Sequence, residues 1–198
     1  MGDHAEKNIN NNSEVVMNNY YKFLKLICTT AFLCLTFVNQ KIAAQNNTNN
    51  PPNRDSVLNA AREMIAGLTY CALITMDSTG GISARTMNPF SPDENMNVWM
   101  ATNKHTRKYF EIKKNPNVTL YYADHSKVDG YVSIKGKAVL VDDMAVKLKM
   151  KRDYWSQAFP DFNDLILIKV VPQRLEIIYY KHKLYNAEVT WDPPAVEF

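Results

Sequence analysis

The chain has 198 residues, of which 46% are hydrophobic and 22% are charged, and this balance is ordinary for a folded domain. Its formal net charge of +3 is too small to indicate a nucleic-acid-binding protein, because such proteins carry a clearly basic face. The sequence has no G-x-G-x-x-G, no P-loop and no G-x-S-x-G. These are the main signatures of Rossmann dehydrogenases, P-loop enzymes and α/β-hydrolases, so none of these classes is indicated.

The first 45 residues have the layout of a secretory signal peptide. Lys22 and Lys25 precede an apolar run over residues 26–38, and the small residues of "KIAAQ" follow it. A run of this length spans only about 20 Å as a helix, which is too short for a bilayer core of ~30 Å. The other interpretation is a buried core helix, but the Asn- and Pro-rich stretch at 46–54, which reads as a linker, does not favour it.

We expect cleavage after Ala44 or Gln45, which predicts a bacterial protein that is periplasmic or secreted and keeps no stable membrane anchor. Residues 1–16 are polar and add nothing that a signal needs, so Met17 is an alternative start. Cleavage would leave Cys71 as the one remaining cysteine, which excludes an internal disulfide in the mature chain.

Hydrophobic patterns beyond residue 54 predict a helix and then a hairpin. The helix begins near Asp55 or Ser56, and Gly67 lies where a helix stop is expected. Strands over 69–77 and 82–90 are joined by the turn "STGG".

A polar loop separates this hairpin from a strand at 97–102, which leads into a helix over about 106–114. The helix is expected to stop before Pro116, because the residue that precedes a proline is disfavoured in the helical region. Strands at 118–124 and 131–143 follow, joined by a loop that contains glycine.

A further helix is expected from Asp143 toward Trp155, and strands at 164–171 and 174–181 complete the sheet. We expect residues 182–198 to form a C-terminal tail. About seven short strands at hairpin spacing, with helices between some of them, favour a mainly β (α+β) fold, an antiparallel barrel with peripheral helices.

Metal-binding and acid–base patterns are weak in this sequence. His105, His125 and His182 form no H-x-x-x-H pair and no C-x-x-C is present, so a metal site has little support. The neighbouring carboxylates Asp142 and Asp143 are most simply a helix start, where acidic residues are favoured.

The segment "TNKHTRK" (102–108) joins a strand end to a helix start. Backbone N–H groups are unpaired at a helix start, so a phosphate bound there gains from these donors and from the helix dipole. Thr106 would add a hydroxyl, and Arg107 and Lys108 would add charge-assisted hydrogen bonds. Arg85, in the middle of a strand, is a second candidate cation. The other interpretation is a solvated basic turn, with Arg85 reaching out to solvent.

From about residue 55 to 181, the chain resembles the FMN-binding split-barrel proteins related to pyridoxamine 5′-phosphate oxidase, and within them the general stress protein subgroup. The resemblance rests on "GGISARTMNPF", "VWMATNKHTRKYFEIKKNPNVTLYYAD" and "YVSIKGKAVLVDD". It implies an antiparallel split β-barrel with peripheral helices, FMN as the cofactor, and a homodimer with two flavins at the subunit interface.

The resemblance also implies which residues hold the flavin. By the same likeness, Tyr131 and the segment from Trp155 to Phe159 would reach the partner's flavin. Family members use a strand arginine with the backbone after it, a strand-end threonine and an [ST]-R-K helix start. On this chain these positions are Arg85, Thr86, Met87, Thr102, Asn103, Thr106, Arg107 and Lys108.

Two departures from the family pattern bear on activity. The C-terminal stretch "YYKHKLYNAEV" lacks the Arg-x-His motif of the true oxidase, and Phe90 replaces a family lysine. We therefore expect an exported FMN-dependent oxidoreductase with an unidentified donor and acceptor, and not an efficient pyridoxamine 5′-phosphate oxidase. The alternatives are a non-catalytic flavin or haem carrier on the same barrel and a cofactor-free interaction barrel, because a fold does not fix a function.

Overall fold

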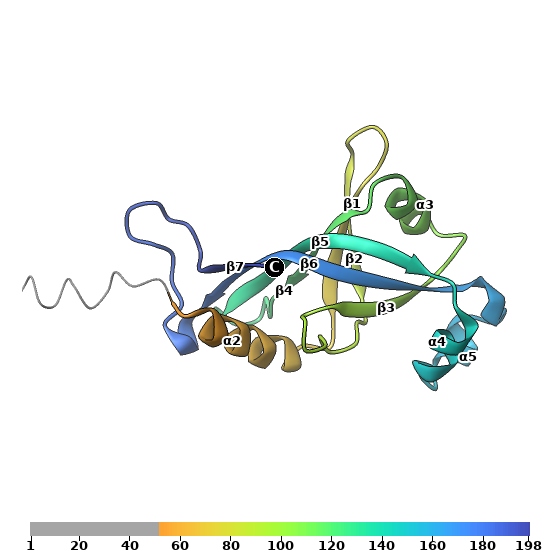
Figure 1. Cartoon of the computed structure of the whole chain (residues 1–198), viewed down its shortest axis with the longest axis horizontal. Helices are drawn as coiled ribbons and strands as arrows, with labels where there is room; N and C mark the ends of the chain where they lie inside the picture. Colours follow the sequence, from red (N-terminus) through yellow and green to blue (C-terminus); the bar gives the residue numbers. More distant parts are fainter. Residues whose placement is uncertain (1–51) are drawn as a thin grey trace, which may run out of the picture. The chain divides into compact units, whose positions relative to one another are not determined.

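The computed structural model describes residues 52–198, so the predicted signal peptide and most of the predicted linker lie outside the described residues (Figure 1). None of the described helices is long and apolar enough to cross a membrane. The helices are α2 (Arg54–Ala66), α3 (Arg107–Lys114), α4 (Met144–Lys149) and α5 (Trp155–Ala158). The strands are β1 (Cys71–Met76), β2 (Ile82–Met87), β3 (Val98–Asn103), β4 (Asn117–Tyr122), β5 (Gly130–Val141), β6 (Leu165–Tyr179) and β7 (Ala195–Glu197).

The described strands form one antiparallel sheet in the order β2-β1-β4-β5-β6-β3, and β7 pairs with the C-terminal half of β6. Within the described sheet, the end strands β2 and β3 are not paired with each other, so the sheet curls without closing, as a half-barrel (Figure 1). The expected mainly β fold, an antiparallel split barrel with peripheral helices, is confirmed.

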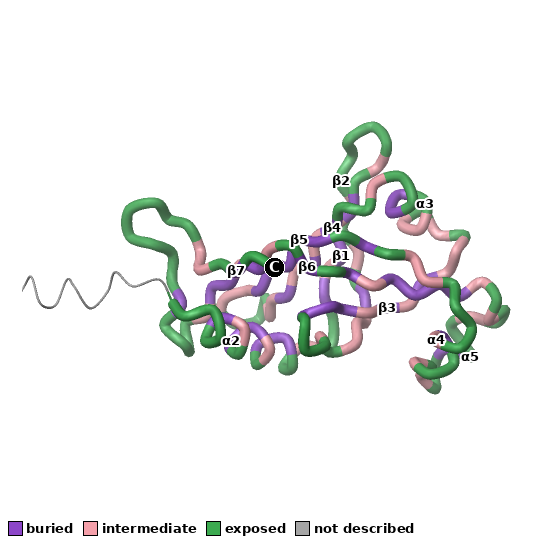
Figure 2. Tube along the Cα trace, viewed as in Figure 1, coloured by how far each residue is buried: buried purple, intermediate pink, exposed green. Residues whose placement is uncertain are grey.

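The core follows from alternation along the strands, since successive side chains point to opposite faces. In β1, Cys71, Leu73 and Thr75 are buried, while the residues between them are partly exposed. The apolar face of α2, with Val57 and Ala61, packs onto the same core (Figure 2).

The expectation of two strands at 164–171 and 174–181 is wrong, because β6 runs without a break from Leu165 to Tyr179. Pro172 lies within this strand, although proline cannot donate a ladder hydrogen bond. In the structure Pro172 lies opposite Gly136, next to a register shift in β5. A Cβ on Gly136 would lie 2.2 Å from the carbonyl oxygen of Val171, so glycine permits this close approach.

The expectation of one helix from Asp143 toward Trp155 is also wrong. Asp143 does cap α4, because its carboxylate accepts a hydrogen bond of 3.0 Å from the N–H of Val146. The chain then leaves the helix after Lys149 and re-enters a short helix, α5, at Trp155. Arg152, between the two helices, donates hydrogen bonds to the segment that follows β2, and these tertiary contacts replace helical ones.

Candidate functional site

A cavity of about 360 Å³ lies where the ends of β2 and β3 meet the start of α3 and the segment around α5. Its size falls at the lower end of the range for small-molecule pockets. Residues from three stretches of the chain line it, within 86–88, 101–108 and 154–159. They are Thr86, Met87, Asn88, Ala101, Thr102, Asn103, Thr106, Lys108, Tyr154, Ala158 and Phe159.

The start of α3 faces this cavity with its backbone donors uncapped by any described side chain. Thr106 is the N-cap residue, but its hydroxyl donates a hydrogen bond of 2.8 Å to the carbonyl oxygen of Asn103 instead of accepting one from the helix. The first turn of α3 contains no acidic residue. A helix start with free N–H groups and no nearby carboxylate cap suits an anion.

Lys108 adds a positive charge to this helix start. Its Nζ donates a hydrogen bond of 3.2 Å to Oγ1 of Thr102, and that hydroxyl lies 3.2 Å from Oγ1 of Thr106. Burial, and then the nearby charge of Arg85, lower the pKa of Lys108 below its ordinary value. The cavity therefore brings two hydroxyls and an ammonium group together. The ammonium group suits a phosphate or a carboxylate, and each hydroxyl would join it by turning its O–H away from its present acceptor.

The two arginines predicted for the site lie beside the cavity rather than in its wall, and both contact Glu111. Nη2 of Arg85 lies 2.6 Å from Oε2 of Glu111, and Nε of Arg107 lies 3.2 Å from Oε1. The hydroxyl of Thr75 donates to the same carboxylate over 2.6 Å. Burial would raise the pKa of Glu111, but the hydrogen bonds from Thr75 and Arg85 outweigh it and hold that pKa below its usual range.

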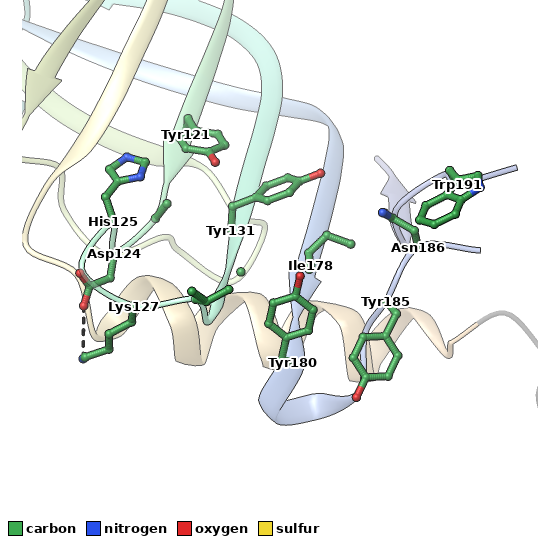
Figure 3. A pocket seen from close by; sticks show the side chains of 13 residues that line it. Tyr121, Asp124, His125, Lys127, Tyr131, Ile178, Tyr180, Tyr185, Asn186 and Trp191 are labelled. Atoms are coloured by element: carbon green, nitrogen blue, oxygen red, sulfur yellow. Dashed lines mark ion pairs between the residues drawn. The ribbon is translucent and has the colours of Figure 1, made fainter. Parts of the chain in front are cut away.

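Tyr131 lies away from this cavity, in the wall of a second one of about 530 Å³. Its ring stacks on that of Tyr121, with centroids 5.5 Å apart, and Tyr180, Tyr185 and Trp191 line other parts of the same cavity (Figure 3). The second cavity shares no lining residue with the first. On one chain, the residue expected to reach a partner's flavin is thus separate from the residues expected to hold the chain's own.

Trp155 is buried within its own chain, with 1% of its surface exposed. It packs edge-on against Phe90 and Phe159, with ring centroids 6.1 Å away in both pairs. Its neighbours Tyr154 and Phe159 line the first cavity in its place. The Trp155 side chain thus packs in the core, while Tyr154 and Phe159 face the cavity.

The sequence does not predict Glu111 and Thr75 as the contacts of the two arginines. Sequence patterns place Glu111 in the helix that follows "TNKHTRK" and Thr75 in a strand, and give neither residue a role in the site. A weak signal was present, because a carboxylate four residues after Arg107 is placed for an i, i+4 ion pair. The contact of Glu111 with Arg85 and Thr75 has no comparable local signature.

Residues 57–183 match the family model described as "Pyridoxamine 5'-phosphate oxidase like", and the chain belongs to this family. The family expected from the motifs is thereby confirmed. No curated protein matches the chain.

Solved structures of several bacterial proteins share the fold. General stress protein 26 of Bacillus anthracis is 20% identical, with a TM-score of 0.56 over 71% of this chain and 97% of that one. A related protein of Clostridium acetobutylicum is 17% identical, with a TM-score of 0.60 over 74% and 97% of the two chains. A pyridoxamine 5'-phosphate oxidase-related, FMN binding protein of Nostoc punctiforme is 14% identical, with a TM-score of 0.52 over 76% and 98%.

Proposed function

We propose that this chain is an FMN-binding flavoprotein and an oxidoreductase that passes hydride or electrons between a small-molecule donor and an acceptor. The observation that carries the proposal is the group of donors at the start of α3, where Thr102, Thr106 and Lys108 converge on one cavity. A phosphate there would be held by backbone N–H groups and an ammonium group, and by the two hydroxyls once they turn from their present acceptors. Family membership and the FMN-binding relative from Nostoc add support.

The remaining walls of the cavity suit the flavin ring. Met87, Ala101, Tyr154 and Phe159 supply apolar and aromatic surface beside the polar donors. A bound flavin would supply the redox chemistry, and the part of the protein would be to bind it, orient it and tune its surroundings. The backbone next to Thr86 and Met87, at the end of an unclosed edge strand, would approach the ring.

The same proposal includes a homodimer with the flavin at the subunit interface. The first cavity is bounded by the unpaired ends of the sheet, and a second copy would cover it. The aromatic cavity around Tyr131 would then offer surface to the partner's flavin, because such rings stack well on a planar ligand. Light scattering of the flavin-loaded protein should give the mass of two chains, and a monomer with bound flavin would overturn this part.

We also propose that the protein is exported. The support is the apolar run at 26–38 with a small-residue exit, which lies outside the described residues. Mass analysis of protein recovered from the export compartment should show a chain that begins near Gln45 or Asn46. A chain there that still begins at Met1 or Met17 would contradict export by signal cleavage.

The absorbance spectrum of the purified protein tests the cofactor. Bound FMN should give the yellow two-band flavin spectrum, whereas a Soret band would indicate a haem carrier and a colourless protein that binds neither would indicate an interaction barrel. Reduction by dithionite, NADH or NADPH would then separate an enzyme from a carrier. Pyridoxamine 5′-phosphate should be turned over far below the rate usual for enzymes, on the order of 10 per second.

A further inference from the structure

We propose that Glu111 is the positioning residue of the flavin phosphate site. Its carboxylate binds one side of each guanidinium, of Arg85 and of Arg107, and so directs their remaining N–H groups toward the anion. This inference rests on the proposed function and adds to it a residue that would touch neither the flavin nor its substrate. Glu111 is 5% exposed, so its charge is kept in the protein interior and must be matched there.

The geometry at Arg85 leaves donors free. A guanidinium has five N–H donors. Nη1 of Arg85 donates a hydrogen bond of 2.5 Å to Oγ1 of Thr75, and Nη2 donates one of 2.6 Å to Oε2 of Glu111. Thr75 in turn donates to Glu111, so the three side chains close a ring of hydrogen bonds. Among residues 52–198 the structure gives Arg85 no other hydrogen bond, which leaves three N–H donors on a group that two hydrogen bonds hold in place.

Arg107 contacts the same carboxylate from the helix, but less firmly than Arg85 does. Its Nε lies 3.2 Å from Oε1 of Glu111, and its side chain is 76% exposed. Lys108, the next residue, faces the cavity from the same turn of α3. Burial and the nearby charge of Arg85 lower its pKa. Three cations thus lie around one helix start, and Glu111 is the carboxylate that contacts two of them.

Without Glu111, the two arginine side chains would have to be ordered when the phosphate binds. Ordering flexible side chains costs affinity, and a prearranged site avoids that cost. The mutual repulsion of Arg85, Arg107 and Lys108 would also be uncompensated, which would drive the guanidinium groups toward solvent. A carboxylate buried behind them is therefore a means of keeping a cationic site in one arrangement before the anion arrives.

The test is a titration of the flavin-free protein with FMN and, separately, with riboflavin, followed by flavin fluorescence. Glu111→Gln keeps the size of the side chain and removes its charge. We expect it to weaken FMN binding about 10-fold, as for the loss of order in two long side chains, and to change riboflavin binding less than twofold. Glu94→Gln, which removes the same charge from an exposed loop, should leave both affinities unchanged.

A double-mutant cycle separates positioning from a general loss of structure. If Glu111 acts through the arginines, Glu111→Gln should weaken FMN binding less in an Arg107→Ala background than in the wild type, about 3-fold instead of 10-fold. Thr75→Val, which removes the hydroxyl that bridges Arg85 and Glu111, should lower FMN affinity in the same direction. A melting curve of each variant shows whether it is folded, so a failure to fold is recognised directly.

Equal losses for FMN and riboflavin, or strictly additive effects in the cycle, would overturn the inference and leave Glu111 a structural residue. Unchanged FMN affinity in folded Glu111→Gln and Thr75→Val would also overturn it, while the proposed function would stand. Wild-type protein that binds neither flavin would overturn the proposed function, and this inference with it.

Discussion

The guanidinium of Arg152 lies over the face of Phe90, with its Cζ 3.8 Å from the centre of the ring. The same group donates hydrogen bonds of 2.8 Å to Oδ1 of Asn88 and to the carbonyl oxygen of Pro89. It thereby fastens the segment after β2 to the segment between α4 and α5. Both segments lead into walls of the candidate flavin cavity, so this one side chain fixes their separation.

Arg152→Ala should lower the free energy of unfolding by about 1–3 kcal/mol, because it removes a cation–π contact and two hydrogen bonds. Arg152→Lys should recover only part of this loss, because an ammonium group lacks the planar fork that serves ring and carbonyl together. Urea denaturation measures both changes. Lys149→Ala, an exposed cation of the neighbouring helix, is the control, and equal midpoints for Arg152→Ala and wild type would contradict the fastening role.

Lys108→Ala should weaken FMN binding by roughly 1.5–3 kcal/mol, about 10- to 150-fold, because a hydrogen bond to a charged group is lost. Riboflavin, which lacks the phosphate, should bind the variant as it binds the wild type. Fluorescence titration of the flavin-free protein measures both affinities. Lys113→Ala removes an exposed cation from the far end of the same helix and should have no effect on either. Equal losses for the two flavins would contradict phosphate binding and indicate that Lys108 contacts the flavin ring or stabilises the fold.

Arg85→Ala and Arg107→Ala should differ in their effect on stability, although both arginines contact Glu111. Arg85 is 16% exposed, and its removal leaves a buried carboxylate short of its closest charged partner, which costs about 3 kcal/mol. Arg107 is 76% exposed, and its removal should cost no more than about 0.5 kcal/mol. Urea denaturation of the two variants checks the difference, and similar losses would show that the Glu111 charge is not matched mainly by Arg85.

The stability of the protein in acid should depend on Glu63, which ties α2 to the segment after β6. Hydrogen bonds from Lys181 and then His182 lower the pKa of Glu63 from 4.5 to about 2. Because the folded-state pKa lies below the unfolded one, this contribution is fully present above pH 4.5 and is lost as the pH falls toward 2. The effect should be small, since the group is exposed and screened by solvent.

Glu63→Gln should therefore flatten the dependence of stability on pH between about 2 and 4.5, without changing its slope near neutral pH. Urea midpoints measured at intervals across that range test the expectation. Glu94→Gln removes a carboxylate with no such partners and serves as the control. An unaltered slope in Glu63→Gln would show that the contacts with Lys181 and His182 do not persist in solution.

The sequence by itself determined the parts of this protein that depend on neighbours along the chain. The hairpin of β1 and β2 follows from alternating hydrophobic residues around "STGG", and β3 runs into α3 as its periodicity predicts. Thr102, Thr106 and Lys108 meet for the same reason, since a strand end and the first helical turn after it cannot be far apart. Their grouping at one cavity was therefore predictable from spacing alone.

The tertiary structure decided what depends on residues far apart in the chain. Arg85 and Glu111 are separated by 26 positions, and only the packing of α3 against the hairpin brings their charges together. The burial of Trp155 and the unbroken path of β6 through Pro172 are of the same kind. Local periodicity predicts which face of an element is apolar, but not which other element packs against that face. The free energy of burial depends on that packing partner.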